Sequence, residues 1–232
     1  MESDARPTPA SYKELASLLD VPITAPELTT AQVVELLEAA KRYGIGCATV
    51  RPCDIDVAVR ALGGSTVRPG AVAGFPHGSS STGVKLYEIR DLLRRGAVEI
   101  EMVAPIPKLV SREFPYVQTE FLQAAEACHR EHAVLKVAID SPCLNEEMKI
   151  VACRCAERAE VDVVKGVADD VALLRKHLPE ETGIEAAGAE GVEQLLAMHA
   201  AGCTRFSAGA FGRILDEWKA RAAAEQPETT KR

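Results

Sequence analysis

The segment VDVVKGVADD, Val161 to Asp170, decides how the rest of the chain is interpreted. Its closely spaced valines predict a buried β-strand, and that strand ends on Lys165, which Gly166 follows at once. A lysine is an unusual end for an apolar strand, because burying a charge is costly unless the charge is paired. The segment therefore raises two questions, about the fold that holds the strand and about the task of the lysine.

Similar apolar segments recur along the chain and alternate with segments of helical character. The predicted strands span residues 17–23, 46–50, 70–75, 98–103, 133–139, 161–167, 183–187 and 204–209. The predicted helices span residues 29–43, 54–62, 82–95, 114–131, 144–159, 168–178, 190–201 and 211–224. Eight strand–helix units in 232 residues predict an α/β protein with a single (β/α)₈ TIM barrel.

The barrel domain is expected over residues 17–220, between two segments without a core. We expect residues 1–16 to be a flexible N-terminal segment and residues 221–232 to be a disordered tail, because chain ends that are not tied down are poorly ordered.

Composition excludes several function classes. The chain is 47% hydrophobic and carries a net charge of -7, without the basic concentration of a nucleic-acid-binding protein. No apolar run is long enough to span a membrane, and the polar N-terminus does not resemble a signal peptide. Seven scattered cysteines then predict free thiols in the reducing cytoplasm. We expect no nucleic acid, membrane, metal or cofactor.

Strand parity predicts where the charged residues point. Alternate residues of a barrel strand face the interior and the helices. If Ile100 and Met102 pack on helices, the glutamates between and before them point inward. The same reasoning on the other strands predicts an interior set of Glu99, Glu101, Lys136, Asp140, Lys165 and Glu185. Ionisable groups of this kind gather at functional sites, although structural ion pairs would also explain them.

The lysine suggests a particular chemistry. A lysine buried in a barrel can lose its proton near neutral pH. A neutral amine attacks a carbonyl carbon and forms a Schiff base, whose protonated imine permits a neighbouring carbon–carbon bond to form or break.

Four motifs in order resemble those of the deoxyribose-phosphate aldolases and their relatives among the class I aldolases. They are GFPHG at 74–78, GAVEIEMV at 96–103, LKVAIDS at 135–141 and VDVVKGV at 161–167. The resemblance runs from about Leu18 to Leu215 and implies a (β/α)₈ fold. It places the Schiff-base role on Lys165 and puts Glu101 where the family has a catalytic aspartate.

The departures from the family pattern concern the second lysine and the phosphate loops. Glu185 stands where the family has a lysine that lowers the pKa of the nucleophile. A carboxylate there would raise that pKa, or it could carry the protons that imine formation requires. Gly188 is followed by alanine rather than glycine, and Gly209 by alanine in place of the family's serines. The hydroxyl groups that would hold a phosphate are therefore depleted.

The predicted catalytic residues are Lys165, Glu185 and Glu101. The predicted substrate-binding residues are Asp20, Arg51, His77, Lys136, Asp140, Gly188, Ser207 and Gly209. Among them, Arg51 could instead form a salt bridge, and His77 has a weak claim to chemistry. Arg205 begins the last strand and is predicted to be structural.

The favoured function is that of a Schiff-base aldolase-type lyase acting on a small carbonyl compound other than deoxyribose 5-phosphate. Three alternatives stay open: the deoxyribose-phosphate aldolase reaction itself, a non-catalytic barrel that binds a metabolite or a partner, and an isomerase or cyclase that uses the carboxylates without an imine. The resemblance is also compatible with a homodimer.

Overall fold

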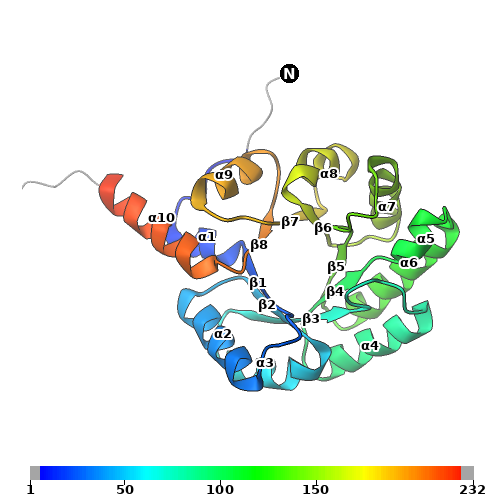
Figure 1. Ribbon diagram of the computed structural model, residues 1–232, viewed down its shortest axis with the longest axis horizontal. Coiled ribbons are helices and arrows are strands. Elements are labelled where there is room, and N and C mark those ends of the chain that lie inside the picture. Colours follow the sequence, from blue (N-terminus) through cyan, green and yellow to red (C-terminus); the bar gives the residue numbers. More distant parts are fainter. Residues whose placement is uncertain (1–5, 226–232) are drawn as a thin grey trace, which may run out of the picture.

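A computed structural model describes residues 6–225 as a closed barrel of eight parallel strands (Figure 1). Each strand pairs with the next along the chain, and β1 closes the barrel by pairing with β8. The strands are β1 (Leu19–Ile23), β2 (Cys47–Val50), β3 (Arg68–Ala73), β4 (Glu99–Val103), β5 (Val134–Ala138), β6 (Val163–Val167), β7 (Gly183–Ala187) and β8 (Arg205–Ser207). This confirms the predicted single (β/α)₈ barrel.

Helices surround the barrel as an outer layer (Figure 1). They are α1 (Tyr12–Ser17), α2 (Thr30–Tyr43), α3 (Ile55–Leu62), α4 (Thr82–Arg94), α5 (Ile106–Val110), α6 (Phe114–Arg130), α7 (Glu146–Arg158), α8 (Val171–His177), α9 (Val192–Ala200) and α10 (Phe211–Glu225). Short 3₁₀ helices, η1 (Pro52–Asp54) and η2 (Ala168–Asp170), precede α3 and α8. None of the helices in the described part of the chain is long and apolar enough to cross a membrane.

Local signals in the sequence explain the boundaries of α2. Thr29 and Gln32 form a reciprocal capping box at its start, which satisfies backbone donors that have no partner inside the helix. Gly44 ends the helix with a φ of 67°, a left-handed conformation that favours glycine.

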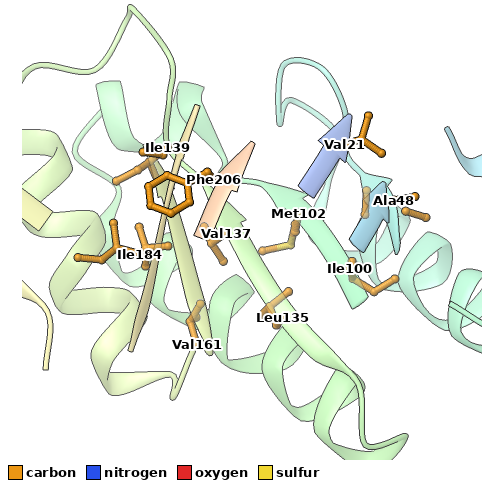
Figure 2. Packing of buried hydrophobic residues seen from close by; sticks show 14 of the residues in the cluster. Val21, Ala48, Ile100, Met102, Leu135, Val137, Ile139, Val161, Ile184 and Phe206 are labelled. Atoms are coloured by element: carbon orange, nitrogen blue, oxygen red, sulfur yellow. The ribbon is translucent and has the colours of Figure 1, made fainter. Parts of the chain in front are cut away.

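The apolar core lies between the barrel and the helices (Figure 2). Ile100 and Met102 of β4, Leu135 and Val137 of β5 and Ile184 of β7 are fully buried there. Since these residues face the helices, the residues between them face the barrel interior, as strand parity predicts.

Both ends of the described chain are more ordered than the sequence suggested. Residues 12–16 of the predicted flexible segment belong to α1, with Leu15 buried in the core. The sequence feature that indicates this helix is the capping pattern from Ser11 to Glu14, in which the Ser11 hydroxyl accepts a hydrogen bond from the Glu14 N–H. Helix α10 likewise continues through residues 221–225 of the predicted tail. The predictions for residues 1–5 and 226–232 lie outside the described residues.

The motif GFPHG shapes the loop that follows β3. Gly78 has a φ of 64°, and a Cβ atom at this position would lie 1.8 Å from the backbone oxygen of Ala104. Gly74, also at positive φ, donates its N–H to Glu88 of α4. The glycines therefore seat the loop against the end of β4, at the mouth of the barrel, by which we mean the end where the strand C-termini lie.

Candidate active site

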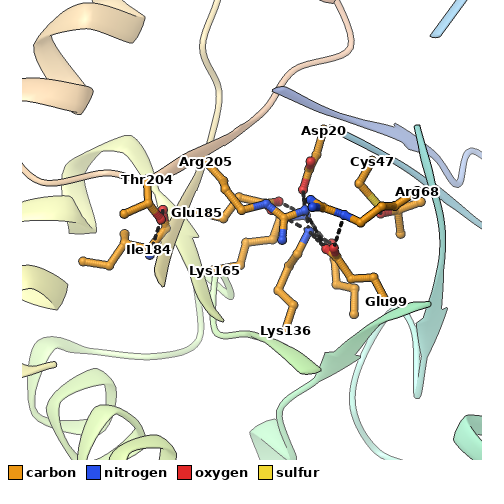
Figure 3. A network of polar contacts seen from close by, with 12 residues as sticks. Asp20, Cys47, Arg68, Glu99, Lys136, Lys165, Ile184, Glu185, Thr204 and Arg205 are labelled. Carbon is orange, nitrogen blue, oxygen red and sulfur yellow. Dashed lines mark hydrogen bonds and ion pairs between the residues drawn. The ribbon is translucent and has the colours of Figure 1, made fainter. Parts of the chain in front are cut away.

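Lys136 of β5 lies at the centre of a network of ion pairs inside the barrel (Figure 3). Its side chain is fully buried, and its Nζ atom lies within 3.4 Å of four carboxylates. The distances are 2.5 Å to Glu185, 2.9 Å to Asp20, 3.1 Å to Glu99 and 3.4 Å to Glu101. A buried cation needs such partners, because desolvation costs several kcal/mol per ion.

Arg205 completes the half of this network that lies away from the mouth. Its guanidinium donates to Asp20 and, at 2.7 Å, to Glu99. Burial alone would raise the pKa of Asp20, but Lys136 and Arg205 outweigh it and the net pKa is lowered. Asp20, Glu99, Glu101, Lys136, Lys165, Glu185 and Arg205 are called the interior network below. The contacts of Arg205 fit its predicted structural role.

Lys165 of β6 lies on the mouth side of the interior network. Its side chain is 7% exposed, and its Nζ atom lies 2.7 Å from Oε1 of Glu101 and 3.7 Å from Oε1 of Glu185. The register explains the second contact, because Lys165 pairs directly with Glu185 on the neighbouring strand β7. The structure thus brings together the three residues that the sequence predicts to be catalytic.

The surroundings of Lys165 favour its charged form at rest. Burial alone lowers the pKa of its amine, but Glu101 and Glu185 raise it, and the net shift is upward. Of the two opposing effects that the sequence left open, the carboxylates therefore outweigh burial at the resting site. Glu101 shows the complementary effect, since burial opposes its charge while Lys165 and Lys136 lower its pKa.

Glu185 is the carboxyl group that favours its neutral form. It is fully buried, and desolvation raises its pKa to about 8 despite the nearby lysines. Neither of its oxygens accepts a hydrogen bond of good geometry from the described residues, although Oε2 lies 2.5 Å from Lys136 Nζ. At neutral pH Glu185 can therefore act as a proton donor, whereas Glu101 can act as a proton acceptor.

Two predicted substrate-binding residues, His77 and Asp140, line a cavity of about 570 Å³ at the mouth. Both side chains are exposed and follow β3 and β5, respectively. The predicted interior position of Asp140 is therefore wrong, because β5 ends at Ala138 and Asp140 lies beyond it in the loop. Desolvation by the surrounding protein raises the pKa of Asp140. The cavity also carries apolar side chains from the loops after β3, β4 and β5.

Arg51 does not fit its predicted substrate-binding role. Its Nε donates to Asp54 at 2.6 Å, and its two terminal nitrogens donate to the backbone oxygens of Ala25, Pro26 and Leu28. The two terminal nitrogens thus hold the loop between β1 and α2, and Nε holds Asp54 of η1, so the structure favours a structural role.

Of the remaining predicted binding residues, Asp20 and Lys136 are buried in the interior network, and three others lie on the β7 and β8 side of the mouth. Ser207 ends β8 and is buried opposite Asp20 in the register. Gly188, with a φ of 97°, and Gly209 follow β7 and β8, and both have open space where a side chain would be. Their part in binding stays a prediction.

Protein carboxylates approach the backbone at the starts of the helices that follow β6 and β7. Asp170 accepts the Val167 N–H at 3.2 Å and the Lys149 ammonium at 2.6 Å. Glu217 of α10 accepts the Val192 N–H of α9 at 3.4 Å. Helix N-termini are common binding sites for anions. At these two helix starts, carboxylates of the protein itself take the place that an anion could occupy.

Sequence reasoning missed two clusters of polar residues. Lys85 of α4 and Glu120 of α6 form a fully buried ion pair of 2.6 Å between the helices, which the helical periodicity of neither segment reveals. Asp20, Cys47 and Glu99 place ligand atoms within 4.8 Å of one another and could by distance hold a metal. Both of these carboxylates already pair with Lys136 and Arg205.

Comparison with known proteins identifies the class. The chain is 32% identical over 221 residues to a deoxyribose-phosphate aldolase of Caldanaerobacter subterraneus subsp. tengcongensis, a match that covers 90% of this chain and 95% of that protein. It is 33% identical over 205 residues to the Enterococcus faecalis deoxyribose-phosphate aldolase, covering 84% and 93% of the two chains. No protein-family model matches.

A solved structure agrees with these relatives. The tetrameric deoxyribose phosphate aldolase from Aeropyrum pernix superposes with a TM-score of 0.80 at 25% identity, covering 91% of this chain and 93% of that one. The fold and these relatives define a class I aldolase-like lyase, a class that works through a lysine Schiff base. Within that class, the chain belongs to the deoxyribose-phosphate aldolase family.

Proposed function

We propose that this protein is a Schiff-base aldolase in which Lys165 is the nucleophile, Glu101 takes its proton and Glu185 supplies one. The observation that carries the proposal is the position of Lys165, buried at the mouth between Glu101 and Glu185. The pKa of Glu101 is lowered, which favours its ionised form, and the pKa of Glu185 is raised, which favours its protonated form.

The proton balance of imine formation suits this pair. Glu101 accepts a proton from the Lys165 ammonium across the 2.7 Å contact, and the freed amine attacks the carbonyl carbon. Glu185 protonates the carbonyl oxygen and takes back a proton from the new C–N nitrogen. Glu101 then returns its proton to the hydroxyl group, which leaves as water. One ammonium and one carbonyl become one iminium and one water, and both carboxyl groups end as they began.

The substrate we propose is a carbonyl compound other than deoxyribose 5-phosphate. The relatives are named for a phosphorylated sugar, but here the carboxylates of Asp170 and Glu217 already accept backbone N–H groups at helix starts on the β6 and β7 side of the mouth. A phosphate would meet carboxylates there, and helix N-termini that already have such partners offer it less stabilisation.

A non-catalytic binding barrel is the second candidate, because the raised pKa of Lys165 opposes nucleophilic attack. Borohydride trapping with a panel of aldehydes separates the two functions. The Schiff-base mechanism predicts one covalent adduct, located by peptide mapping at Lys165 and absent from Lys165→Ala. Lys176→Ala, which removes an exposed lysine of α8, is the matched control and should keep the adduct. A fully active Lys165→Ala variant would refute imine chemistry.

A further inference from the structure

The cavity at the mouth is mainly apolar in its lining. Phe75, Val103, Ile106, Pro107 and Ala138 contribute apolar surface to its volume of about 570 Å³. Its lining within the described chain contains the carboxylate of Asp140, the imidazole of His77 and no lysine or arginine. Phe75 is 48% exposed. We call this space the side cavity.

The register places the floor of the side cavity next to Lys165. Val103 lies two residues beyond Glu101, and Ala138 lies two residues beyond Lys136, so both share the inward face of their strands. Val103 pairs with Ala138, and Ala138 pairs with Lys165 on the next strand. Since neighbouring strands are about 4.8 Å apart, a group bound to Lys165 can extend from the amine into the cavity.

We propose that the side cavity binds an uncharged, apolar substituent, aliphatic or aromatic, of the carbonyl compound that reacts with Lys165. This inference rests on the proposed function and adds the class of substrate. An anionic substituent is disfavoured because it would face Asp140 without a lysine or arginine in the lining to offset the repulsion. An apolar substituent would cover Phe75 and Ile106 and remove their surface from water.

The size of the side cavity suits a short chain or a single ring. Ligand cavities in proteins commonly measure about 300–1,000 Å³. Each methylene group removed from water strengthens binding by about fourfold. An aldehyde with four more methylene groups than acetaldehyde should therefore saturate Lys165 at a concentration at least about tenfold lower, even if only half of the added chain is buried.

Trapping with three aldehydes tests the inference. Acetaldehyde, hexanal and glyceraldehyde 3-phosphate are titrated against the full chain with borohydride, and the adduct on the Lys165 peptide is quantified. We expect half-saturation at least about tenfold lower for hexanal than for acetaldehyde, and no advantage for the phosphate. Ile106→Ser should reduce severalfold the ratio of the acetaldehyde half-saturation concentration to that of hexanal. Val110→Ser, on the same helix α5 but 46% exposed and outside the cavity lining, should retain it.

The outcomes separate this inference from the proposed function. No adduct on Lys165 with any aldehyde would overturn the Schiff-base proposal itself. An adduct on Lys165 with equal half-saturation for hexanal and acetaldehyde would overturn only the side-cavity assignment. The same holds if Ile106→Ser leaves the ratio unchanged, or if glyceraldehyde 3-phosphate is the preferred compound.

Discussion

Replacing Glu185 by glutamine should change how stability depends on pH. Glu185 is fully buried, and its pKa is raised from 4.5 to about 8 by desolvation. The folded state therefore holds this proton more tightly than the unfolded state. Between pH 4.5 and about 8, the folded protein loses stability as the pH rises. That interval, at about 1.4 kcal/mol for each pH unit, amounts to about 5 kcal/mol.

Urea denaturation from pH 5 to pH 9 measures this effect. The free energy of unfolding of the wild type should fall relative to that of Glu185→Gln by about 4–5 kcal/mol over this range, because glutamine has no proton to lose. Glu35→Gln, an exposed position on α2, is the matched control. Its profile should run parallel to the wild type.

Parallel profiles for wild type and Glu185→Gln would refute this reasoning. Glu185 would then be ionised throughout the range, and Lys136 at 2.5 Å would be stabilising its charge more than burial opposes it. In that case Glu185 could not donate a proton at neutral pH, and the acid step of the proposed mechanism would have to come from another group.

Three other predictions follow from the same contacts. The rate of borohydride trapping at Lys165, measured as adduct against pH, should fall above about pH 8, because Glu185 loses its proton there. In Glu185→Gln the trapping rate should be lower by about 10²-fold. This variant should also lack the fall above about pH 8. Lys85→Met should cost about 3–5 kcal/mol in urea denaturation because it leaves Glu120 unpaired, and adding Glu120→Leu should recover most of the loss. Acetaldehyde release from deoxyribose 5-phosphate should be no faster than from deoxyribose, and a strong preference for the phosphate would favour the reaction named in the relatives.

Strand parity predicted the interior charges because a barrel imposes a simple alternation. Ile100 and Met102 are buried against helices, so Glu101 between them points inward, and the same rule places Lys165 and Glu185 inside. The rule uses only neighbouring residues on one strand. It therefore needs no knowledge of how distant parts of the chain meet.

The interactions that sequence reasoning missed depend on distant segments. Arg205 meets Asp20 across 185 positions of sequence, and Lys85 meets Glu120 from another helix. The direction of the pKa shift of Lys165 could not be predicted from the sequence either, because burial and two carboxylates act in opposite directions. The distances from its Nζ atom, 2.7 Å to Glu101 and 3.7 Å to Glu185, decide the balance.

The count of charges inside the barrel explains why a glutamate here can be an acid. The interior network holds four carboxyl groups, Asp20, Glu99, Glu101 and Glu185, against three cations, Lys136, Lys165 and Arg205. Arg68 approaches Glu99 only to 3.4 Å and is 42% exposed, so solvent screens its charge.

With four carboxyl groups and three cations in the interior network, one carboxyl group has no cation to balance its charge. Glu185 is fully buried, and neither of its oxygens has a well-formed donor among the described residues, so it is the member that gains most by holding a proton. A second lysine at this position would repel the proton of Lys165. Glu185 instead leaves Lys165 charged and stores a proton beside it. In the mechanism that we propose, the reaction therefore starts with a transfer to Glu101, and carbonyl groups reactive enough to capture a rarely free amine are the substrates that it favours.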